Sequence, residues 1–239
     1  MNVLLWLGPV EARNLGGVRL PPGWRLVTVN RGEGGGITSS AFRAACAGGV
    51  DELLRGKAPA TRESLALAGW SAGGAGVDEL LSRGAEDPRV LFVGIFDGYF
   101  NGADVPDEIK PGAYRYAQRA ARGGGEMWVT TGHVGGSGYL SSAESFAPLA
   151  TSIGVRAVAT PDIGLDVVGA HAYGRGLCTW VDYPAGWQPS PSKEHTAHAR
   201  LVAPAVLGTW FRGFGGRKGA GGLAVAVAAL AALALGERR

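Results

Sequence analysis

The fold is decided by the stretch Leu65-Ala66-Leu67-Ala68-Gly69-Trp70-Ser71-Ala72-Gly73-Gly74, which passes from an apolar run into a helical pattern. It contains Gly-x-Ser-x-Gly, the pattern of a nucleophile elbow, in which a serine occupies a tight turn between a strand and a helix. The serine backbone is strained in such a turn, so the residues two before and two after it must be small. Gly69 and Gly73 meet that demand. We therefore predict Ser71 as a nucleophile raised above a sheet edge; the alternative is a glycine-rich turn whose serine caps the helix.

The composition favours a globular domain. The 239 residues are 46% hydrophobic and 18% charged, which argues against disorder. The net charge is +3, but the basic residues are scattered and form no stripe interleaved with aromatics, so nucleic-acid binding is not expected. The two cysteines, Cys46 and Cys178, form no Cys-x-x-Cys pattern, so no metal site is expected. We expect two buried free thiols in a reducing compartment, with a disulfide as the alternative.

Apolar runs alternate with amphipathic helical patterns along the chain. Strands are predicted at 3–7, 24–29, 65–68, 90–96, 127–131 and 176–181, and helices at 39–47, after the elbow to 81, and at 114–122, 141–153 and 195–211. This alternation predicts an α/β fold with a doubly wound, mainly parallel sheet of about six strands and helices on both faces. The apolar N-terminus is predicted as a buried strand rather than a signal peptide. Gly32–Gly36 lacks the spacing of a phosphate-binding loop and is predicted as a loop near the pocket.

The chain changes character after residue 211. Residues 1–211 are predicted as the catalytic domain, 212–221 as a glycine-rich basic linker and 222–239 as an apolar C-terminal helix. The uncharged stretch from Gly219 to Gly236 has 18 residues, at the lower limit of the ~17–25 that span a bilayer. Because basic residues flank both ends, we predict a membrane anchor that tethers a cytoplasmic domain; a helix docked on a partner or another subunit is the alternative.

A serine nucleophile needs a base, and the chain has four histidines. His195 and His198 follow the last predicted strand, from where a loop can reach the sheet edge above Ser71. We favour His195 as the base because it is nearer the loop, and keep His198 as the alternate. His133 and His171 are predicted as surface or capping residues, although His133 also follows a strand and could line the pocket.

The acid that orients the base is predicted to be Asp97. It ends the apolar run 90–96, where a carboxylate is costly to desolvate without a partner. An Asp-Gly turn is the bland alternative for this residue. Asp182, at the end of the last strand, is the second choice, ahead of Asp162 and Asp166. For the oxyanion hole we predict the amides of Ala72 and Val10, since Pro9 in the turn after the first strand has no N–H.

These residues resemble the α/β-hydrolase superfamily over residues 1–211. The resemblance rests on Gly69-Trp70-Ser71-Ala72-Gly73, the strand–helix alternation and the chain order Ser, Asp, His. It implies that Ser71 is the nucleophile, His195 or His198 the base and Asp97 the acid. The chain departs from most members in two ways: the acid lies one strand earlier than usual, and the first strand corresponds to the third of the usual eight. In size it is similar to cutinase-like esterases.

The expected function is that of a serine hydrolase that cleaves a carboxylic ester through an acyl-enzyme intermediate, without a metal or organic cofactor. The expected partner is a small-molecule or acyl-ester substrate, with membrane contact through the C-terminal segment. One alternative is a catalytically inactive hydrolase-fold module for binding or membrane assembly. A second is an amidase or peptidase with the same triad.

Overall fold

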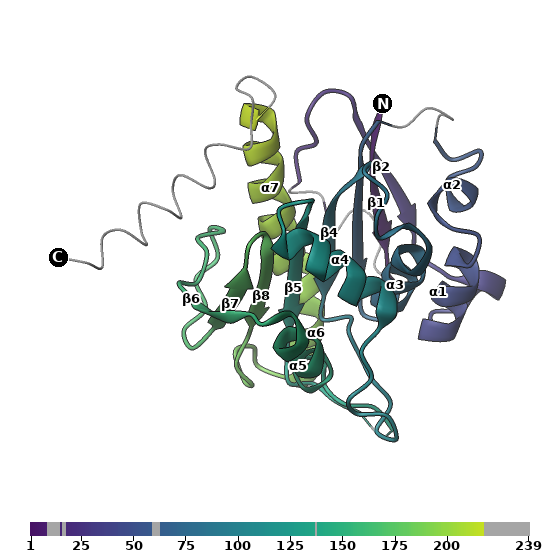
Figure 1. The fold of residues 1–239 in the computed structure, drawn as a ribbon. Helices are drawn as coiled ribbons and strands as arrows, with labels where there is room; N and C mark the ends of the chain where they lie inside the picture. Colours follow the sequence, from purple (N-terminus) through teal and green to yellow (C-terminus); the bar gives the residue numbers. More distant parts are fainter. Residues whose placement is uncertain (9–14, 16–17, 59–62, 137, 218–239) are drawn as a thin grey trace.

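The computed structural model describes residues 1–8, 15, 18–58, 63–136 and 138–217. Its centre is an eight-stranded sheet in the order β2-β1-β3-β4-β5-β8-β7-β6. The strands are β1 (Asn2–Leu7), β2 (Trp24–Val29), β3 (Leu65–Trp70), β4 (Val90–Phe96), β5 (Glu126–Thr131), β6 (Arg156–Val158), β7 (His171–Arg175) and β8 (Cys178–Asp182). Figure 1 shows them crossing the middle of the molecule. The strands from β2 to β8 in this order pair in parallel, whereas β7 pairs antiparallel with both β6 and β8.

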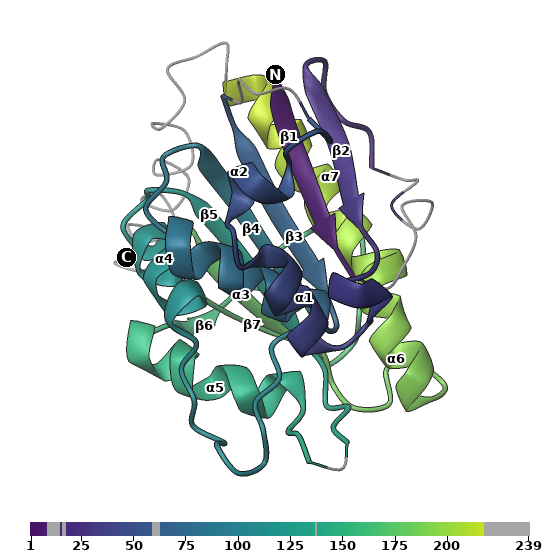
Figure 2. The same ribbon diagram turned by 90° about the vertical axis from the view of Figure 1, so that its right-hand side faces the viewer.

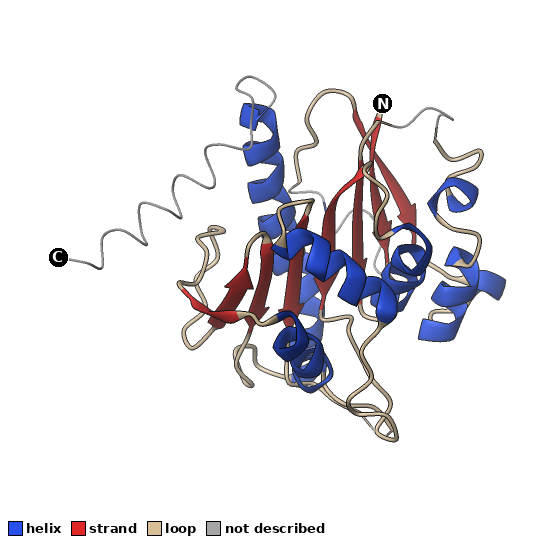
Figure 3. Cartoon of the chain, in the orientation of Figure 1, coloured by secondary structure: helices blue, strands red, loops and turns tan. Residues whose placement is uncertain are grey.

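Helices cover both faces of the sheet. They are α1 (Ser39–Cys46), α2 (Val50–Leu53), α3 (Gly73–Gly84), α4 (Pro111–Ala121), α5 (Ser142–Ile153), α6 (Pro191–Ala197), the π-helical segment η3 (His198–Val202) and α7 (Ala203–Arg217). Figure 2 shows α1, α3 and α4 in front of the sheet and α7 behind it, and Figure 3 shows the strands between these helices. The α/β architecture with helices on both faces is confirmed.

Two apolar cores follow from this layering, one on each face. Phe42, Leu80 and Phe146 belong to the core under α1, α3 and α5, whereas Trp6 and Trp210 belong to the core under α7. Strands β3 and β4, and β1 from Val3 onward, are apolar because both of their faces are covered. Cys46 and Cys178 are buried free thiols, as predicted.

The sheet has eight strands, whereas about six were predicted. Strand β8 pairs in parallel with β5, and beyond it the sheet is extended by an antiparallel pair, β7 and β6, that was not predicted from the sequence. Strand β6 has only three residues, all exposed, so it carries no hydrophobic alternation. The short helix α2 and the 3-10 turn η2 (Glu33–Gly35), within the predicted loop 32–36, were also not predicted.

The prediction of a linker was wrong for residues 212–217, because these residues belong to a helix. Helix α7 continues to Arg217, because Phe214 packs edge-on against Trp24 with 5.3 Å between ring centroids, and also contacts Trp210. The rest of the linker and the predicted C-terminal helix, 218–239, lie outside the described residues. Within the described part of the chain, no helix combines the length and the hydropathy needed to cross a membrane.

Candidate active site

The turn between β3 and α3 has the geometry that the sequence predicted for an elbow. Ser71 lies in the left-handed region with φ 54°. A Cβ on Gly69 would lie 2.7 Å from the Gly73 carbonyl oxygen, and one on Gly73 would lie 2.2 Å from the Leu7 carbonyl oxygen. Both distances are below any van der Waals contact, so each position requires glycine. The packing therefore explains why the serine is flanked by two glycines.

A second strained turn lies directly beside the first. Asp97, the residue after β4, has φ 42°, and within the described residues only Ser71 and Asp97 are non-glycine residues with positive φ. A Cβ on Gly98 would lie 2.8 Å from the Ser71 carbonyl oxygen, and one on Gly74 would lie 2.0 Å from the Gly98 carbonyl oxygen. Such strain persists only where the surrounding structure enforces it, and it concentrates at functional sites. The two turns are packed backbone to backbone, which places Ser71 and Asp97 at one sheet edge.

His195 forms a hydrogen bond with Asp97, which is distant from it in the sequence. Its Nδ1 lies 2.5 Å from Asp97 Oδ2, so the ring donates this N–H to the carboxylate, and Nε2 lies on the opposite side of the ring. Trp70 holds the histidine in place, because its indole N–H donates to the His195 carbonyl at 2.8 Å and the two rings lie 4.7 Å apart. The His195 side chain is 24% exposed, whereas Asp97 is fully buried. The structure thus brings together the predicted acid and the favoured base.

The second oxygen of Asp97 is also occupied. Oδ1 accepts hydrogen bonds from the Gly132 amide at 3.2 Å and from the Ser142 hydroxyl. Burial alone would raise the pKa of this carboxyl, but the His195 hydrogen bond, the electrostatic attraction of His198 and His195 and the Ser142 hydrogen bond hold it below its usual value. Asp97 therefore stays ionised in the core. Neither Ser142 nor Gly132 was predicted, although Ser141 and Glu144 form a capping box that marks the helix start at this point.

His198 lies three residues further on, at the start of η3, and is fully buried. Its Nδ1 pairs with the Thr130 hydroxyl at 3.0 Å, and its ring stands edge-on to Tyr183 and Trp187. Burial lowers the pKa of His198 to about 4. Its Nε2 is buried and has no hydrogen-bond partner among the described residues. The alternate base is thus enclosed in the core, while His195 is open to the sheet edge.

The Ser71 hydroxyl and the two amides predicted for the oxyanion hole are the remaining parts of the predicted site. Within the part of the chain that the structure describes, no hydrogen bond joins the Ser71 hydroxyl to His195 or to another side chain. Hydrogen bonds of catalytic groups are often long in unliganded proteins and shorten when substrate binds. The Ala72 amide, at the start of α3, has no backbone acceptor among these same residues. The second predicted donor, Val10, lies outside the described residues.

The prediction of Asp182 as the alternate acid was wrong. The Asp182 carboxylate accepts a hydrogen bond from the Thr131 hydroxyl at 2.8 Å and pairs with His133 Nε2 at 3.3 Å. Both partners follow from the register, because Thr131 lies opposite Asp182 in neighbouring parallel strands. His133 is 41% exposed, in agreement with its prediction as a surface residue. Asp182 therefore does not share a hydrogen bond with His195.

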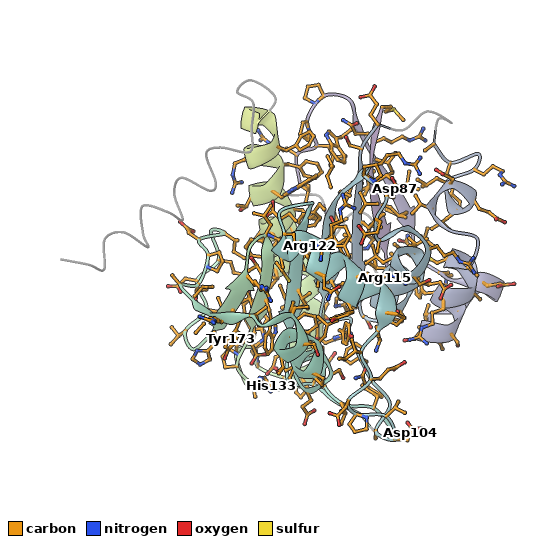
Figure 4. The ribbon with its side chains drawn as sticks, viewed as in Figure 1. Asp87, Asp104, Arg115, Arg122, His133 and Tyr173 are labelled. Carbon is orange, nitrogen blue, oxygen red and sulfur yellow. The ribbon has the colours of Figure 1, made fainter. Side chains whose placement is uncertain are left out.

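A separate cavity lies at the opposite end of the sheet. It has a volume of about 370 Å³ and is lined by Leu67, Val90 and a set of charged side chains that includes Arg89 and Asp87. Figure 4 shows Asp87 at one end of the molecule, with His133 and Asp104 at the other. Arg89 is bound by the carboxylates of Asp87 and Asp51. This cavity is distinct from the Ser71 edge.

Comparisons with known proteins give little functional information. No family model matches the chain. A probable protein phosphatase 2C 26 of rice (Oryza sativa subsp. japonica) is 46% identical over 54 residues, which is 23% of this chain; the chain thus spans only 9% of that protein. A solved structure of the lin2722 gene product of Listeria innocua aligns with 88% of this chain and 93% of its own, at 10% identity and a TM-score of 0.46.

Proposed function

We propose that the chain is a serine hydrolase of α/β-hydrolase type that cleaves carboxylic esters through an acyl-enzyme. The observation that carries this proposal is the buried Asp97 carboxylate, bonded to His195 at 2.5 Å and packed against the strained turn of Ser71. A serine on such a turn, a histidine with one nitrogen fixed by a carboxylate and a free helix-terminal amide are the parts that acyl transfer requires.

The reaction follows from the roles of these groups. His195 Nε2 takes the proton from the Ser71 hydroxyl as Oγ attacks the ester carbonyl, and Asp97 stabilises the imidazolium that forms. The Ala72 amide donates to the oxyanion of the tetrahedral intermediate. His195 then returns the proton to the departing alcohol, which leaves an acyl group on Ser71. Water, deprotonated by His195, attacks this acyl group and releases the carboxylic acid, which regenerates the serine.

The surroundings of His195 suit an apolar substrate group. The centroid of its ring lies 6.1 Å from that of the Phe100 ring, and the centroids of the Phe100 and Tyr139 rings are 5.5 Å apart. Together with Trp70, these aromatic side chains provide apolar surface next to the base. We therefore expect esters with uncharged apolar groups to be better substrates than charged ones.

A series of p-nitrophenyl esters tests the proposal. We expect the wild type to release nitrophenol with a burst of one equivalent, the kinetic mark of an acyl-enzyme. Ser71→Ala and His195→Gln should abolish turnover above background. Ser152→Ala, a change of an exposed serine in α5, is the matched control and should retain full activity. Equal hydrolysis by the wild type and Ser71→Ala would contradict the proposal.

One observation favours a second candidate. Because the Ser71 hydroxyl has no hydrogen bond to His195 in the described chain, a hydrolase-fold module without catalysis is the alternative. Such a module would bind an ester or a product acid without turning it over. A well-folded wild type that binds but does not hydrolyse the ester series would favour this alternative.

A further inference from the structure

His198 is a costly residue for the core of this protein. Its side chain is fully buried, yet Nε2 has no hydrogen-bond partner among the described residues. A buried polar atom without a partner destabilises the folded state, and a phenylalanine of similar size would fill the same space without this cost. The position of the unpaired nitrogen therefore needs an explanation.

The unpaired nitrogen lies beside the Asp97 carboxylate. A Cβ placed on Gly132 would lie 3.3 Å from His198 Nε2 and 3.6 Å from Asp97 Oδ1, so the two atoms flank the same small residue. The Gly132 amide itself donates to Asp97 Oδ1. Any side chain at this position would press on both the imidazole and the carboxylate, so glycine lets the two groups approach the same point.

The other ring nitrogen determines which one carries the proton. His198 Nδ1 lies 3.0 Å from the Thr130 hydroxyl, which can either donate to it or accept from it. The negative charge of Asp97 favours a proton on the nitrogen that faces it, which is Nε2. Thr130 then donates its hydroxyl hydrogen to Nδ1. The other titratable groups that face this ring are His195 and Tyr183.

We propose that His198 is a positioning residue for the Asp97–His195 pair: as a neutral imidazole with its proton on Nε2, it directs an N–H dipole at the Asp97 carboxylate. The dipole stabilises the ionised acid without competing for the oxygen that binds His195. Burial keeps the His198 imidazole uncharged during turnover, so the full charge of Asp97 remains available to the imidazolium of His195. The role of this arrangement in catalysis rests on the proposed function, whereas the tautomer does not.

Nitrogen-15 NMR of the full chain tests the tautomer directly. Protonated and unprotonated ring nitrogens have well-separated shifts, and with four histidines in the chain the spectrum is simple to assign. We expect His198 to remain neutral with the proton on Nε2 from pH 5 to pH 8. A proton on Nδ1, or a charged His198 at pH 7, would overturn the inference without any reference to activity.

The pH profile of kcat/KM for ester hydrolysis tests the positioning role. His198→Phe removes the dipole, so the Asp97 carboxylate attracts positive charge beside it more strongly, and the acid limb should move to higher pH by about half a unit. His198→Gln, which can present an N–H at the same place, should move it less. An unchanged acid limb in a folded, active His198→Phe variant refutes the positioning role. A wild type without turnover instead defeats the proposed function.

Discussion

Acidification should destabilise the protein through His198, and the size of the effect can be worked from its environment. Burial lowers the pKa of this side chain to about 4, from an ordinary value of 6.5. Between these two values the unfolded chain binds a proton that the folded chain does not, so the free energy of unfolding falls as the pH drops. Integrated from pH 7.5 to pH 4.5, this single group should cost about 2–3 kcal/mol.

Urea denaturation at a series of pH values measures this loss. A cost of about 2–3 kcal/mol should lower the midpoint by roughly 1–2 M urea, with an unchanged m value. In His198→Phe this part of the pH dependence should disappear, whatever the stability of the variant at pH 7. The stabilisation from ionised Asp97, whose pKa is lowered, is lost mainly below this range.

A second variant separates titration from packing. Val202→Ala removes apolar contacts from a fully buried position in η3, the segment that begins with His198, without removing an ionisable group. It should lower the midpoint at every pH by a similar amount and keep the slope of the wild type. The reasoning is refuted if His198→Phe keeps the same loss of stability between pH 7.5 and pH 4.5 as the wild type.

Three further predictions concern the site and its frame. Asp97→Asn should lower kcat roughly 10³–10⁴-fold in ester assays because the base loses its orientation, whereas Asp182→Asn should stay near wild type. Gly74→Ala places a Cβ 2.0 Å from a backbone oxygen and should cost about 3 kcal/mol or more in urea melts. Gly84→Ala, in the same helix, places a Cβ in ordinary van der Waals contact, 3.9 Å from the Asp87 Cβ, and should not destabilise. Lys110→Met removes the ammonium group that donates to the Phe100 carbonyl and to Asn101 Oδ1, so it should cost about 1–3 kcal/mol and speed hydrogen exchange in residues 100–110; unchanged exchange would contradict this.

The central strands could be predicted because both of their faces are covered. β4 has the predicted bounds, since its uninterrupted apolar run leaves little choice of element. The edge strand β2 also has its predicted bounds, although its Arg25 is exposed. The pair β6 and β7 could not be found in the same way. β6 is short and exposed, and β7 contains His171, Gly174 and Arg175, so neither shows a hydrophobic period.

The candidate site was predictable where local chemistry demanded particular residues. The elbow around Ser71 and the lone acid at the end of β4 are local signals, and the structure places Asp97 on His195. No local signal in the sequence distinguishes His195 from His198, because a spacing of three residues puts both on one side of a helix. What separates them is burial and the contact of Trp70 with His195, which depend on the assembled fold.

Fluorophosphonate labelling followed by peptide mapping tests the central claim most directly, because the probe reacts only with an activated serine. We predict stoichiometric labelling of the wild type on Ser71, its loss in Ser71→Ala and His195→Gln, and its retention in Ser152→Ala. A folded wild type that is not labelled, or labelling that survives Ser71→Ala, would contradict the claim that this elbow carries a catalytic nucleophile.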